Sequence, residues 1–376
     1  MKTFWNYKKE YSYLRKNILS SIDKVLKSGN IFFGNELKKF EHNFNKLNKS
    51  RYGLAVGSGT EALYIALKSF GIGHGDEVIT VSNTAIPTAS AITSTGATIK
   101  FVDINKDYLI DPEKILKKIN KKTKAIIPVH LYGQSCDMDQ INKIARKNRL
   151  KVIEDCAQAQ GAMYKNKYVG TLGDVGCFSF YPTKILGAYG DGGFITAKSK
   201  KIFEKMRRIR FYGIESLNKK NKFFGKYYSN EQGINSRIDE MQLAILNIKL
   251  LKVNKFISKR IKIAKYYKDK LKNTSLILPN IRKDNKHVFH LFTVYHKKRN
   301  LIFKKLKKLG IKLNIYYPYP IHKMKGYKFL KNNKKLKLHV TEKMSQGIFS
   351  LPLYPEIPPG DLEKITKSLK SVLKSI

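Results

Sequence analysis

The sequence predicts an α/β protein built on a mostly parallel, doubly wound sheet. Short apolar runs typical of buried strands recur through the first 200 residues, and helical patterns such as 137–147 separate several of them. Alternation at this spacing favours parallel strands connected by helices. The expected strands are 52–56, 77–81, 98–102, 125–129, 151–154 and 176–180.

Helical patterns are strong at the start of the chain and again after residue 237. The first 50 residues are amphipathic and interrupted by glycine turns. A second helix-rich stretch covers about 238–272, and the apolar run HVFHLFTVYH and the amphipathic segment 301–317 beyond it are typical of a smaller α+β unit. We therefore expect a large domain at 1–250 and a small C-terminal domain at 251–376.

The composition is that of a folded protein without a membrane span. A hydrophobic content of 42% is too high for a disordered chain. No run reaches the ~18 uncharged apolar residues of a spanning helix, and the N-terminus lacks the apolar core of a secretory leader. Cys136, Cys156 and Cys177 show neither metal-ligand spacing nor a disulfide framework. We expect a cytoplasmic protein with no membrane partner and no metal.

The formal charge of +46 raises the question of nucleic-acid binding. Lysine supplies 63 of the 74 basic residues, whereas arginine is the side chain suited to bidentate recognition of bases and phosphates. The excess is greatest in 251–376, where lysines occupy the polar positions of helical patterns. A solvated basic surface is therefore favoured over a nucleic-acid-binding one, although a positive field would still attract an anionic ligand.

A glycine-rich loop lies between the strand expected at 52–56 and the helix that follows it. Its sequence, VGSGT, ends in Gly59 and Thr60. Glycine lets the backbone approach a ligand, and free N–H groups at a helix start can hold a phosphate. The loop lacks the lysine of a P-loop and the third glycine of a dinucleotide fingerprint. Taken alone, it is better interpreted as an ordinary tight turn.

An acidic residue follows the buried strand expected at 151–154. Asp155 stands at its carboxyl end, where ligands bind in open α/β sheets, and Gln158 lies three residues further on. Such an aspartate can cap a following helix, or it can pair with a protonated ring nitrogen. Both alternatives stay open on this motif alone.

A third motif contains a lysine unlike the others. Ser179 ends an apolar strand, Tyr181 and a proline turn follow, and Lys184 comes next. The ten residues on either side of Lys184 carry no other positive charge, and aromatic residues and glycines surround it. A lysine in such surroundings has a depressed pKa and can act as a nucleophilic amine, while Ser179 could offer its hydroxyl to a phosphate.

A fourth motif, GINSRIDEMQ, places Asn235 and Arg237 at a helix start as candidates for anion contacts. Alone it is simply a capped helix. Together the four motifs provide a phosphate cup, a partner for a pyridinium nitrogen and a Schiff-base lysine. These are the parts of a pyridoxal 5'-phosphate (PLP) site.

In these motifs and their order the chain resembles the DegT/DnrJ/EryC1/StrS family of sugar aminotransferases over nearly its whole length. The resemblance implies the aspartate-aminotransferase fold (PLP fold type I), with a mostly parallel seven-stranded sheet and a smaller C-terminal α+β domain. It also implies PLP-dependent transamination. The matching stretches are GNELKKFE, GSGTEAL, GIGHGDEVIT, AIIPVHLYGQ, VIEDCAQAQGA, GDVGCFSFYPTK, GAYGDGGF, GINSRIDEMQ, YPYPIH and SLPLYPE.

The resemblance also implies roles for individual residues. Lys184 is expected to hold the cofactor as a Schiff base, Asp155 to face its ring nitrogen, and Gln158 to touch its phenolic oxygen. Asn235 is expected to reach the cofactor phosphate of a neighbouring subunit, which makes the protein a homodimer with shared active sites. The residues expected at the phosphate within one chain are Gly59, Thr60 and Ser179.

One position departs from the family pattern. In the segment SNTAIPT the family often carries an aromatic residue that stacks on the cofactor ring, and this chain has Ala85 instead. Ala85 is thus an expected cofactor contact with a small side chain. Either another group stacks on the ring, or the pocket is wider on that side.

The substrates follow from the same resemblance. Glutamate is the usual donor, and Arg237 is our candidate for its carboxylate, against a helix-cap or intersubunit salt bridge. The acceptor is a nucleotide-linked keto-sugar, and the stretch PVHLYGQ favours C3 of a dTDP-3-keto-6-deoxyhexose, for surface glycan or deoxysugar biosynthesis. Candidate sugar contacts are Tyr181, Tyr212, Tyr317 and His322, although a proline-rich turn near 318 equally serves to pack domains together.

Two other enzyme activities stay open at this stage. One is amination at C4 of a UDP-, GDP- or dTDP-4-keto sugar. The other is dehydration, because a branch of the family replaces the Schiff-base lysine by histidine. The presence of Lys184 favours transamination over dehydration.

Overall fold

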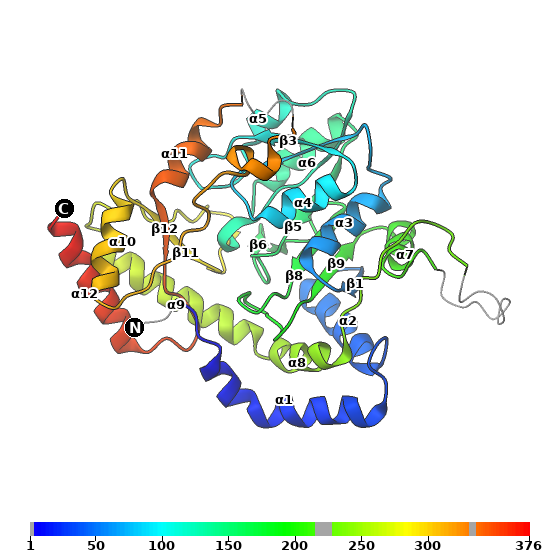
Figure 1. Cartoon of the computed structure of the whole chain (residues 1–376), viewed down its shortest axis with the longest axis horizontal. Helices are drawn as coiled ribbons and strands as arrows, with labels where there is room; N and C mark the ends of the chain where they lie inside the picture. The colour runs from blue at the N-terminus through cyan, green and yellow to red at the C-terminus, as the bar shows by residue number, and fades with distance from the viewer. Residues whose placement is uncertain (1–3, 215–227, 331–335) are drawn as a thin grey trace.

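The computed structural model describes residues 4–214, 228–330 and 336–376. At its centre is a seven-stranded sheet with the order β1-β9-β8-β5-β4-β2-β3 (Figure 1). β9 runs antiparallel to both of its neighbours, and the other strand pairs of this sheet are parallel. The α/β class is thereby confirmed. The strands are β1 Tyr52–Val56, β2 Glu77–Val81, β3 Thr98–Val102, β4 Thr123–Ile126, β5 Lys151–Asp155, β8 Val175–Ser179 and β9 Gly193–Ala197.

The six strands expected from the sequence are all present, with bounds shifted by three residues or fewer. The seventh, β9, is absent from the expected set. All five of its residues are buried, so it shows no alternation of apolar and polar positions. It also follows a run of glycines that is typical of a turn, which hides its start.

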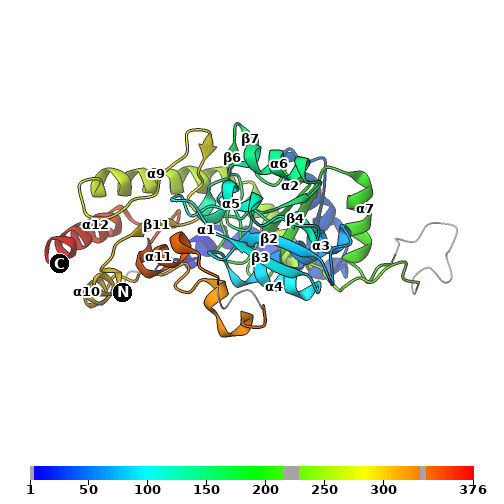
Figure 2. The same ribbon diagram turned by 90° about the horizontal axis from the view of Figure 1, so that it is seen from above.

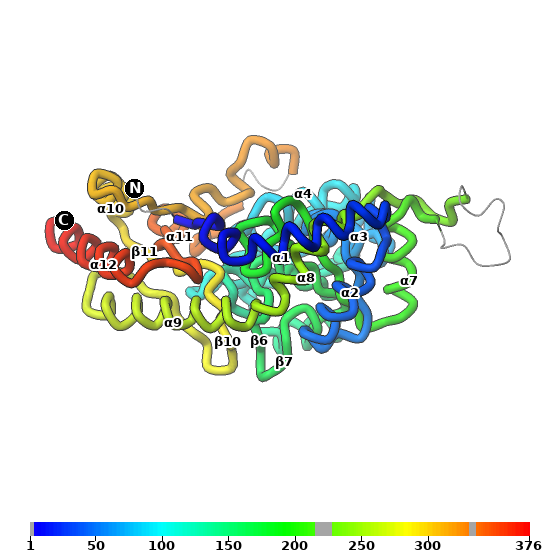
Figure 3. Tube along the Cα trace, turned by 90° about the horizontal axis from the view of Figure 1, so that it is seen from below, coloured from blue at the N-terminus to red at the C-terminus, as the bar shows by residue number. Residues whose placement is uncertain are grey.

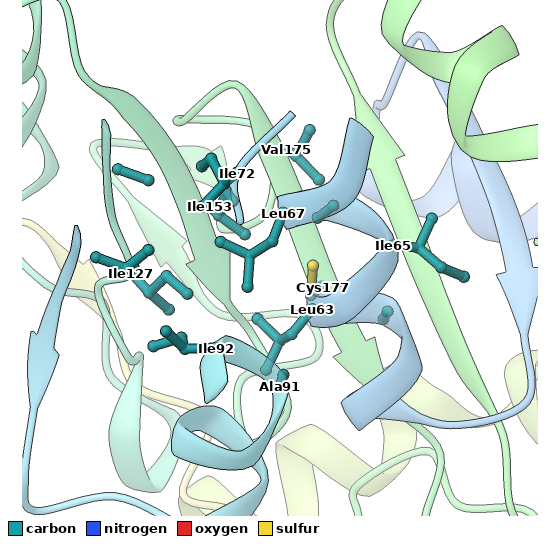
Figure 4. Packing of buried hydrophobic residues seen from close by; sticks show 14 of the residues in the cluster. Leu63, Ile65, Leu67, Ile72, Ala91, Ile92, Ile127, Ile153, Val175 and Cys177 are labelled. Carbon is teal, nitrogen blue, oxygen red and sulfur yellow. The ribbon is translucent and has the colours of Figure 1, made fainter. Parts of the chain in front are cut away.

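Helices cover both faces of this sheet. Successive residues of a strand point to opposite faces. Val175 of β8 therefore joins a core formed by α3, α4 and α7, and Phe178 joins another formed by α2 and α8. Figure 4 shows Leu63 and Leu67 of α3 packed near Ile153 and Val175. The helices are α1 Lys8–Ser28, α2 Asn35–Asn48, α3 Gly59–Ser69, α4 Ile86–Ser94, α5 Pro112–Leu116, α6 Met138–Lys147, α7 Lys200–Ile209, α8 Glu240–Leu250, α9 Val253–Leu271, α10 Arg299–Lys308, α11 His339–Gly347 and α12 Pro359–Lys374.

The C-terminal third builds a further core at one end of the molecule, where Figure 2 shows α9, α10 and α12. These helices pack with the antiparallel pair β11 (Phe292–Tyr295) and β12 (Ile348–Leu351). A small sheet of β10 (Asn285–Lys286), β6 (Met163–Tyr164) and β7 (Lys167–Tyr168) links this part to the large sheet's surroundings. Figure 3 shows α1 running from the side of α12 across to α2.

The domain boundary near residue 250 stays a prediction. Two residues separate α8 from α9, and Ile257 of α9 packs in the core that contains α2 and α8. Ile321 and Leu330 pack in the core around α3. Residues after 250 therefore contribute to more than one core. Within the described ranges, none of the helices combines the length and the apolar character needed to cross a membrane.

Candidate active site

A cavity of about 680 Å³ opens at the carboxyl ends of the parallel strands. Asp155 ends β5 and Ser179 ends β8, and both line this cavity. Ligands bind at this edge of open α/β sheets. The predicted site residues that line the cavity are Gly59, Thr60, Ala85, Asp155, Gln158, Ser179, Tyr181, Lys184 and Tyr317.

Lys184 lies in the turn that follows β8. Its backbone N–H donates to the carbonyl of Tyr181 at 2.8 Å, which holds the turn, and its side chain is partly exposed to the cavity. Burial lowers the pKa of the Lys184 amine to about 8, while the nearby Asp155 carboxylate opposes that shift. The amine is therefore far more often uncharged near neutral pH than an ordinary lysine.

Asp155 is oriented by two hydrogen bonds. Thr88 Oγ1 donates to its Oδ2 at 2.8 Å, and the N–H of Ala157 donates to its Oδ1 at 3.1 Å. The hydroxyl of Thr84 lies 3.0 Å from that of Thr88, which extends the chain of polar contacts. Burial raises the pKa of the Asp155 carboxyl, and both donors and the Lys184 charge act against that rise. The carboxylate is thus fixed in direction and electrically coupled to the lysine.

The start of α3 meets the end of β8 at very short range. Ser58 caps the helix by accepting from the N–H of Glu61 at 3.2 Å, so Gly59 and Thr60 form its first turn. A Cβ added to Gly59 would lie 2.7 Å from Cβ of Ser179. Only glycine permits this approach, which sets the Ser179 hydroxyl beside the free end of a helix. A helix N-terminus with a hydroxyl beside it is suited to a phosphate.

Both the oxygen and the nitrogen of the Gln158 side-chain amide form hydrogen bonds. Its Oε1 accepts from the N–H of Tyr132 at 2.9 Å, and its Nε2 donates to Oη of Tyr317 at 2.9 Å. The hydroxyl of Tyr132 donates to the carbonyl of Tyr316. These bonds tie the loop after β4 and the end of β5 to a segment of the C-terminal third at the cavity wall.

His322 is not among the residues that line this cavity. Its Nδ1 lies 2.7 Å from Oγ of Ser82 and its Nε2 lies 3.1 Å from Glu342, so both ring nitrogens have partners. Its backbone N–H also donates to Ser82 at 3.0 Å. These bonds hold the segment that carries Tyr317, and the expected sugar contact of His322 stays a prediction.

Tyr212, Asn235 and Arg237 also lie outside the cavity lining of this single chain. Asn235 pairs with Phe211 in an isolated bridge, and Tyr212 is half exposed. The Arg237 guanidinium lies 4.5 Å from the ring centroid of Phe32. Asn235 is expected to serve a neighbouring subunit, and its role stays a prediction.

Several lining residues were not expected from the sequence. Thr88 lies three residues after Ala85 in the same segment, so the resemblance could have pointed to it. The Nη1 of Arg260 donates to three backbone carbonyls. Burial and the charge of Lys184 hold the pKa of His290 well below its usual value. No local pattern marks these distant positions. The unexpected lining residues include Phe4, Trp5, Thr88, Arg260, His290, Lys312, Asn314 and Tyr316.

Behind Asp155, the neighbouring Glu154 belongs to a buried group with His130 and Cys156 whose ligand atoms lie close enough to suggest a metal. The Glu154 carboxylate already accepts from Nε2 of His130 at 2.9 Å and from the N–H groups of Gly170, Leu172 and Gly173. Four donors satisfy it without a cation. The group therefore serves to fix the loop beneath the site.

The comparisons with known proteins agree with this geometry. The family model of the DegT/DnrJ/EryC1/StrS aminotransferase family matches residues 12–370. A dTDP-3-amino-3,4,6-trideoxy-alpha-D-glucose transaminase of Micromonospora megalomicea subsp. nigra is 39% identical over 99% of each chain. A dTDP-3-amino-3,6-dideoxy-alpha-D-galactopyranose transaminase of Aneurinibacillus thermoaerophilus is 42% identical over 94% of this chain and 95% of that protein.

A solved structure extends the likeness to three dimensions. The crystal structure of DesV of S. venezuelae in complex with a ketimine intermediate is 34% identical to this chain, with a TM-score of 0.93. The superposition covers 100% of this chain and 99% of that one. Sequence motifs, fold and cavity agree, and the chain belongs to the DegT/DnrJ/EryC1/StrS aminotransferase family.

Proposed function

We propose that the protein transfers the amino group of L-glutamate to C3 of a dTDP-linked 3-keto-6-deoxyhexose, with PLP as its cofactor. The observation that carries the proposal is the pairing of Lys184, with its pKa of about 8, and Asp155 in one cavity of the fold. The names of the two relatives above, which both specify a 3-amino sugar linked to dTDP, support the choice of C3.

The residues of the cavity fit PLP. The cradle that a Cβ on Gly59 would fill, together with Thr60 and Ser179, is suited to the cofactor's phosphate. Lys184 would hold the cofactor covalently, Asp155 would face its ring nitrogen and Gln158 would lie beside its ring oxygen. When bound, PLP supplies an electron sink for charge that develops at the α-carbon of an amino substrate.

The chain's own residues then handle protons. Because the pKa of the Lys184 amine is about 8, the same group can accept a proton and return it near neutral pH. Thr88 and the N–H of Ala157 hold the Asp155 carboxylate in one orientation, in which its negative charge would face the ring nitrogen of a bound cofactor. The role of the protein is thus to keep an uncharged amine and a fixed carboxylate in one cavity.

Ala85 lies in the cavity wall, where the family often has an aromatic residue. Because alanine is small, position 85 contributes no aromatic ring to the cavity lining. Leu63, Pro87 and Ala157 are further lining residues without polar side chains. We infer that aliphatic side chains of the cavity lining, rather than a ring at position 85, pack against the cofactor.

The working unit is proposed to be a homodimer with shared sites. Asn235 and Arg237 do not line the cavity of their own chain, which agrees with a role toward a neighbouring subunit. Arg237 would then meet the donor carboxylate of the partner's site. Gel filtration with multi-angle light scattering tests the dimer, and mixing inactive Lys184→Ala chains with inactive Asn235→Ala chains tests sharing, because hybrid dimers would recover one intact site.

The decisive experiment compares keto-sugars side by side. PLP-loaded protein is incubated with L-glutamate and either dTDP-3-keto- or dTDP-4-keto-6-deoxyhexose, and 2-oxoglutarate release is followed. Mass spectrometry and NMR of the product should show an amine at C3. An amine at C4, or turnover with UDP- or GDP-4-keto sugars alone, would replace the proposed acceptor. Absence of 2-oxoglutarate with every sugar would overturn the transamination itself.

The less favoured nucleic-acid interpretation makes an opposite prediction. A nucleic-acid-binding protein would be retained on DNA in a salt-sensitive way and would take up no cofactor colour. The proposed transaminase should acquire the absorbance of bound PLP and lose it in Lys184→Ala. The cavity around Lys184 favours the enzyme.

A further inference from the structure

A short aromatic arm, residues 4–7, precedes α1 and borders the cavity. Phe4 and Trp5 both line the cavity that contains Lys184. Trp5 is the single tryptophan of the chain, and its side chain is only partly buried. The family motifs and the roles derived above account for neither residue.

The arm is anchored from both sides. The Trp5 ring stacks on Tyr7 with centroids 5.3 Å apart, and Tyr7 lies 5.8 Å from Tyr189 of the large-sheet half. The Phe4 ring lies 5.9 Å from Tyr316, and Trp5 also packs against the C-terminal core. An indole fixed in this way contributes to the cavity lining at little further entropic cost.

The C-terminal third adds polar residues to the cavity lining. Lys312 and Asn314 line the same cavity from the C-terminal third, and the Lys312 side chain is exposed. An indole face binds planar bases by stacking, and an ammonium group binds phosphate oxygens. An aromatic ring and a cation in one cavity match a ligand that joins a planar base to a diphosphate.

We propose that Trp5 stacks on the base of a nucleoside diphosphate and that Lys312 contacts its phosphates, so that the arm and the C-terminal wall bind the nucleotide half of the substrate. This inference rests on the proposed function, because the nucleotide is the part of that substrate which takes no part in amino transfer. Trp5 of the arm at 4–7 thereby has a role in specificity for the nucleotide.

The first test uses the fluorescence of Trp5 in full-length, PLP-loaded protein. Because the chain has one tryptophan, every change in indole emission reports on Trp5. Free dTDP, UDP and GDP are titrated separately, with thymidine and inorganic pyrophosphate as partial ligands. At least one nucleoside diphosphate should change the emission saturably, and thymidine should do so with weaker affinity. The proposal is overturned if none of the three diphosphates changes it.

The second test separates binding from catalysis. Trp5→Ala should raise KM for the nucleotide sugar about tenfold and change kcat much less, because the base would lose a stacking surface. Trp5→Phe keeps a flat ring and should recover most of the loss. Tyr13→Ala is the matched control, since Tyr13 is an exposed aromatic residue of the neighbouring helix α1 that does not line the cavity. An equal rise in KM in Tyr13→Ala would show that the effect is not specific to Trp5 and would overturn the proposal.

A variant of Lys312 tests the proposed phosphate contact separately. Lys312→Ala should weaken dTDP binding about tenfold and leave thymidine binding nearly constant, because thymidine carries no phosphate. Equal weakening of both ligands would contradict a phosphate contact. Here binding is measured by isothermal titration, so the result does not depend on turnover.

A control on the unmodified protein keeps this inference separate from the proposed function. PLP-loaded protein given L-glutamate without any sugar should release 2-oxoglutarate once per site. If this fails, the proposed donor reaction is wrong whatever the arm does. If it succeeds while all three nucleoside diphosphates leave Trp5 emission unchanged, the arm proposal alone is wrong.

Discussion

The two walls of the active-site cavity differ in how the chain builds them. The sheet-side wall is made of strand ends and the turns that follow them, with Gly59, Asp155 and Lys184 as examples. The opposite wall is assembled from residues far apart in sequence, including Trp5 before α1 and Asn314 in the C-terminal third. We propose that the first wall carries the chemistry and that the second selects the substrate.

This difference indicates how one fold can retain the residues of a reaction while the residues that select the substrate vary. Strand ends are held by the ladder of the central sheet, so their side chains have little freedom. The arm at 4–7 lies outside the ladder of the central sheet, so we expect that exchanging it would leave the sheet intact. The following predictions test that division, from the largest effect to the smallest.

Two lysines of the cavity provide the sharpest contrast. Lys184→Ala should lower transamination about 10⁴-fold and abolish the absorbance of covalently held PLP, because no amine replaces it on the sheet-side wall. Lys312→Ala, on the opposite wall, should retain that absorbance. Absorbance spectra and 2-oxoglutarate release measure both. Retention of cofactor absorbance in Lys184→Ala would refute the assignment of the covalent lysine.

Two neighbouring carboxylates of β5 provide the next contrast. Asp155→Asn should lower kcat about 10²–10³-fold and change the free energy of unfolding by less than about 1.5 kcal/mol, since it faces the cavity and has two donors. Glu154→Gln should destabilise the fold by about 3 kcal/mol, because an amide nitrogen would face donors that the buried carboxylate now satisfies.

Urea denaturation and steady-state kinetics separate these two effects. If Asp155→Asn loses stability as Glu154→Gln does, the two carboxylates would share a structural role. If Glu154→Gln were as stable as the unmodified protein, its network beneath the site would be dispensable. Either result would contradict the division between chemistry and support along this strand.

The sheet-side wall could be predicted from sequence because its residues lie in short motifs with a fixed relation to a strand or helix. The strand before Asp155 and the neutral segment around Lys184 can each be recognised from neighbouring residues in the sequence. The strand β9 was missed because full burial removes the alternating pattern. Even so, the six expected strands sufficed to define the fold class.

The opposite wall could not be predicted because tertiary packing alone brings it together. Trp5 reaches the cavity through contacts with Tyr7 and with the C-terminal core, and nothing in its neighbours marks that position. Conversely, His322 lies in a motif of aromatic and proline residues, yet its ring is engaged by Ser82 and Glu342. A motif locates a segment but does not fix which side chains face the ligand.

The pH dependence of Lys184 tests the electrostatics of the sheet-side wall. Burial lowers its pKa from 10.5 to about 8, so the neutral amine should increase about tenfold per pH unit up to pH 8 and then level off. Competitive acetylation of cofactor-free protein, followed by mass spectrometry, measures this reactivity. Continued increase up to pH 10 would contradict the shift.

The charge of Asp155 predicts the direction in which the pKa of Lys184 shifts when Asp155 is replaced. Its carboxylate raises the pKa of Lys184 against the effect of burial. Asp155→Asn removes that attraction, so the plateau of Lys184 reactivity should begin below pH 8. A plateau that moves to higher pH would mean that the two groups are not coupled as the geometry implies.

The smallest predicted effect concerns Thr88, which touches the Asp155 carboxylate. Thr88→Val keeps the side-chain shape and removes the donor at 2.8 Å from Oδ2, so kcat should fall about tenfold, the equivalent of about 1.4 kcal/mol. Thr88→Ser restores a hydroxyl at the same carbon and should recover most of the activity. A purely structural role would instead lower the unfolding midpoint of both variants in proportion to kcat. Full activity in Thr88→Val would show that the Ala157 N–H alone orients the carboxylate.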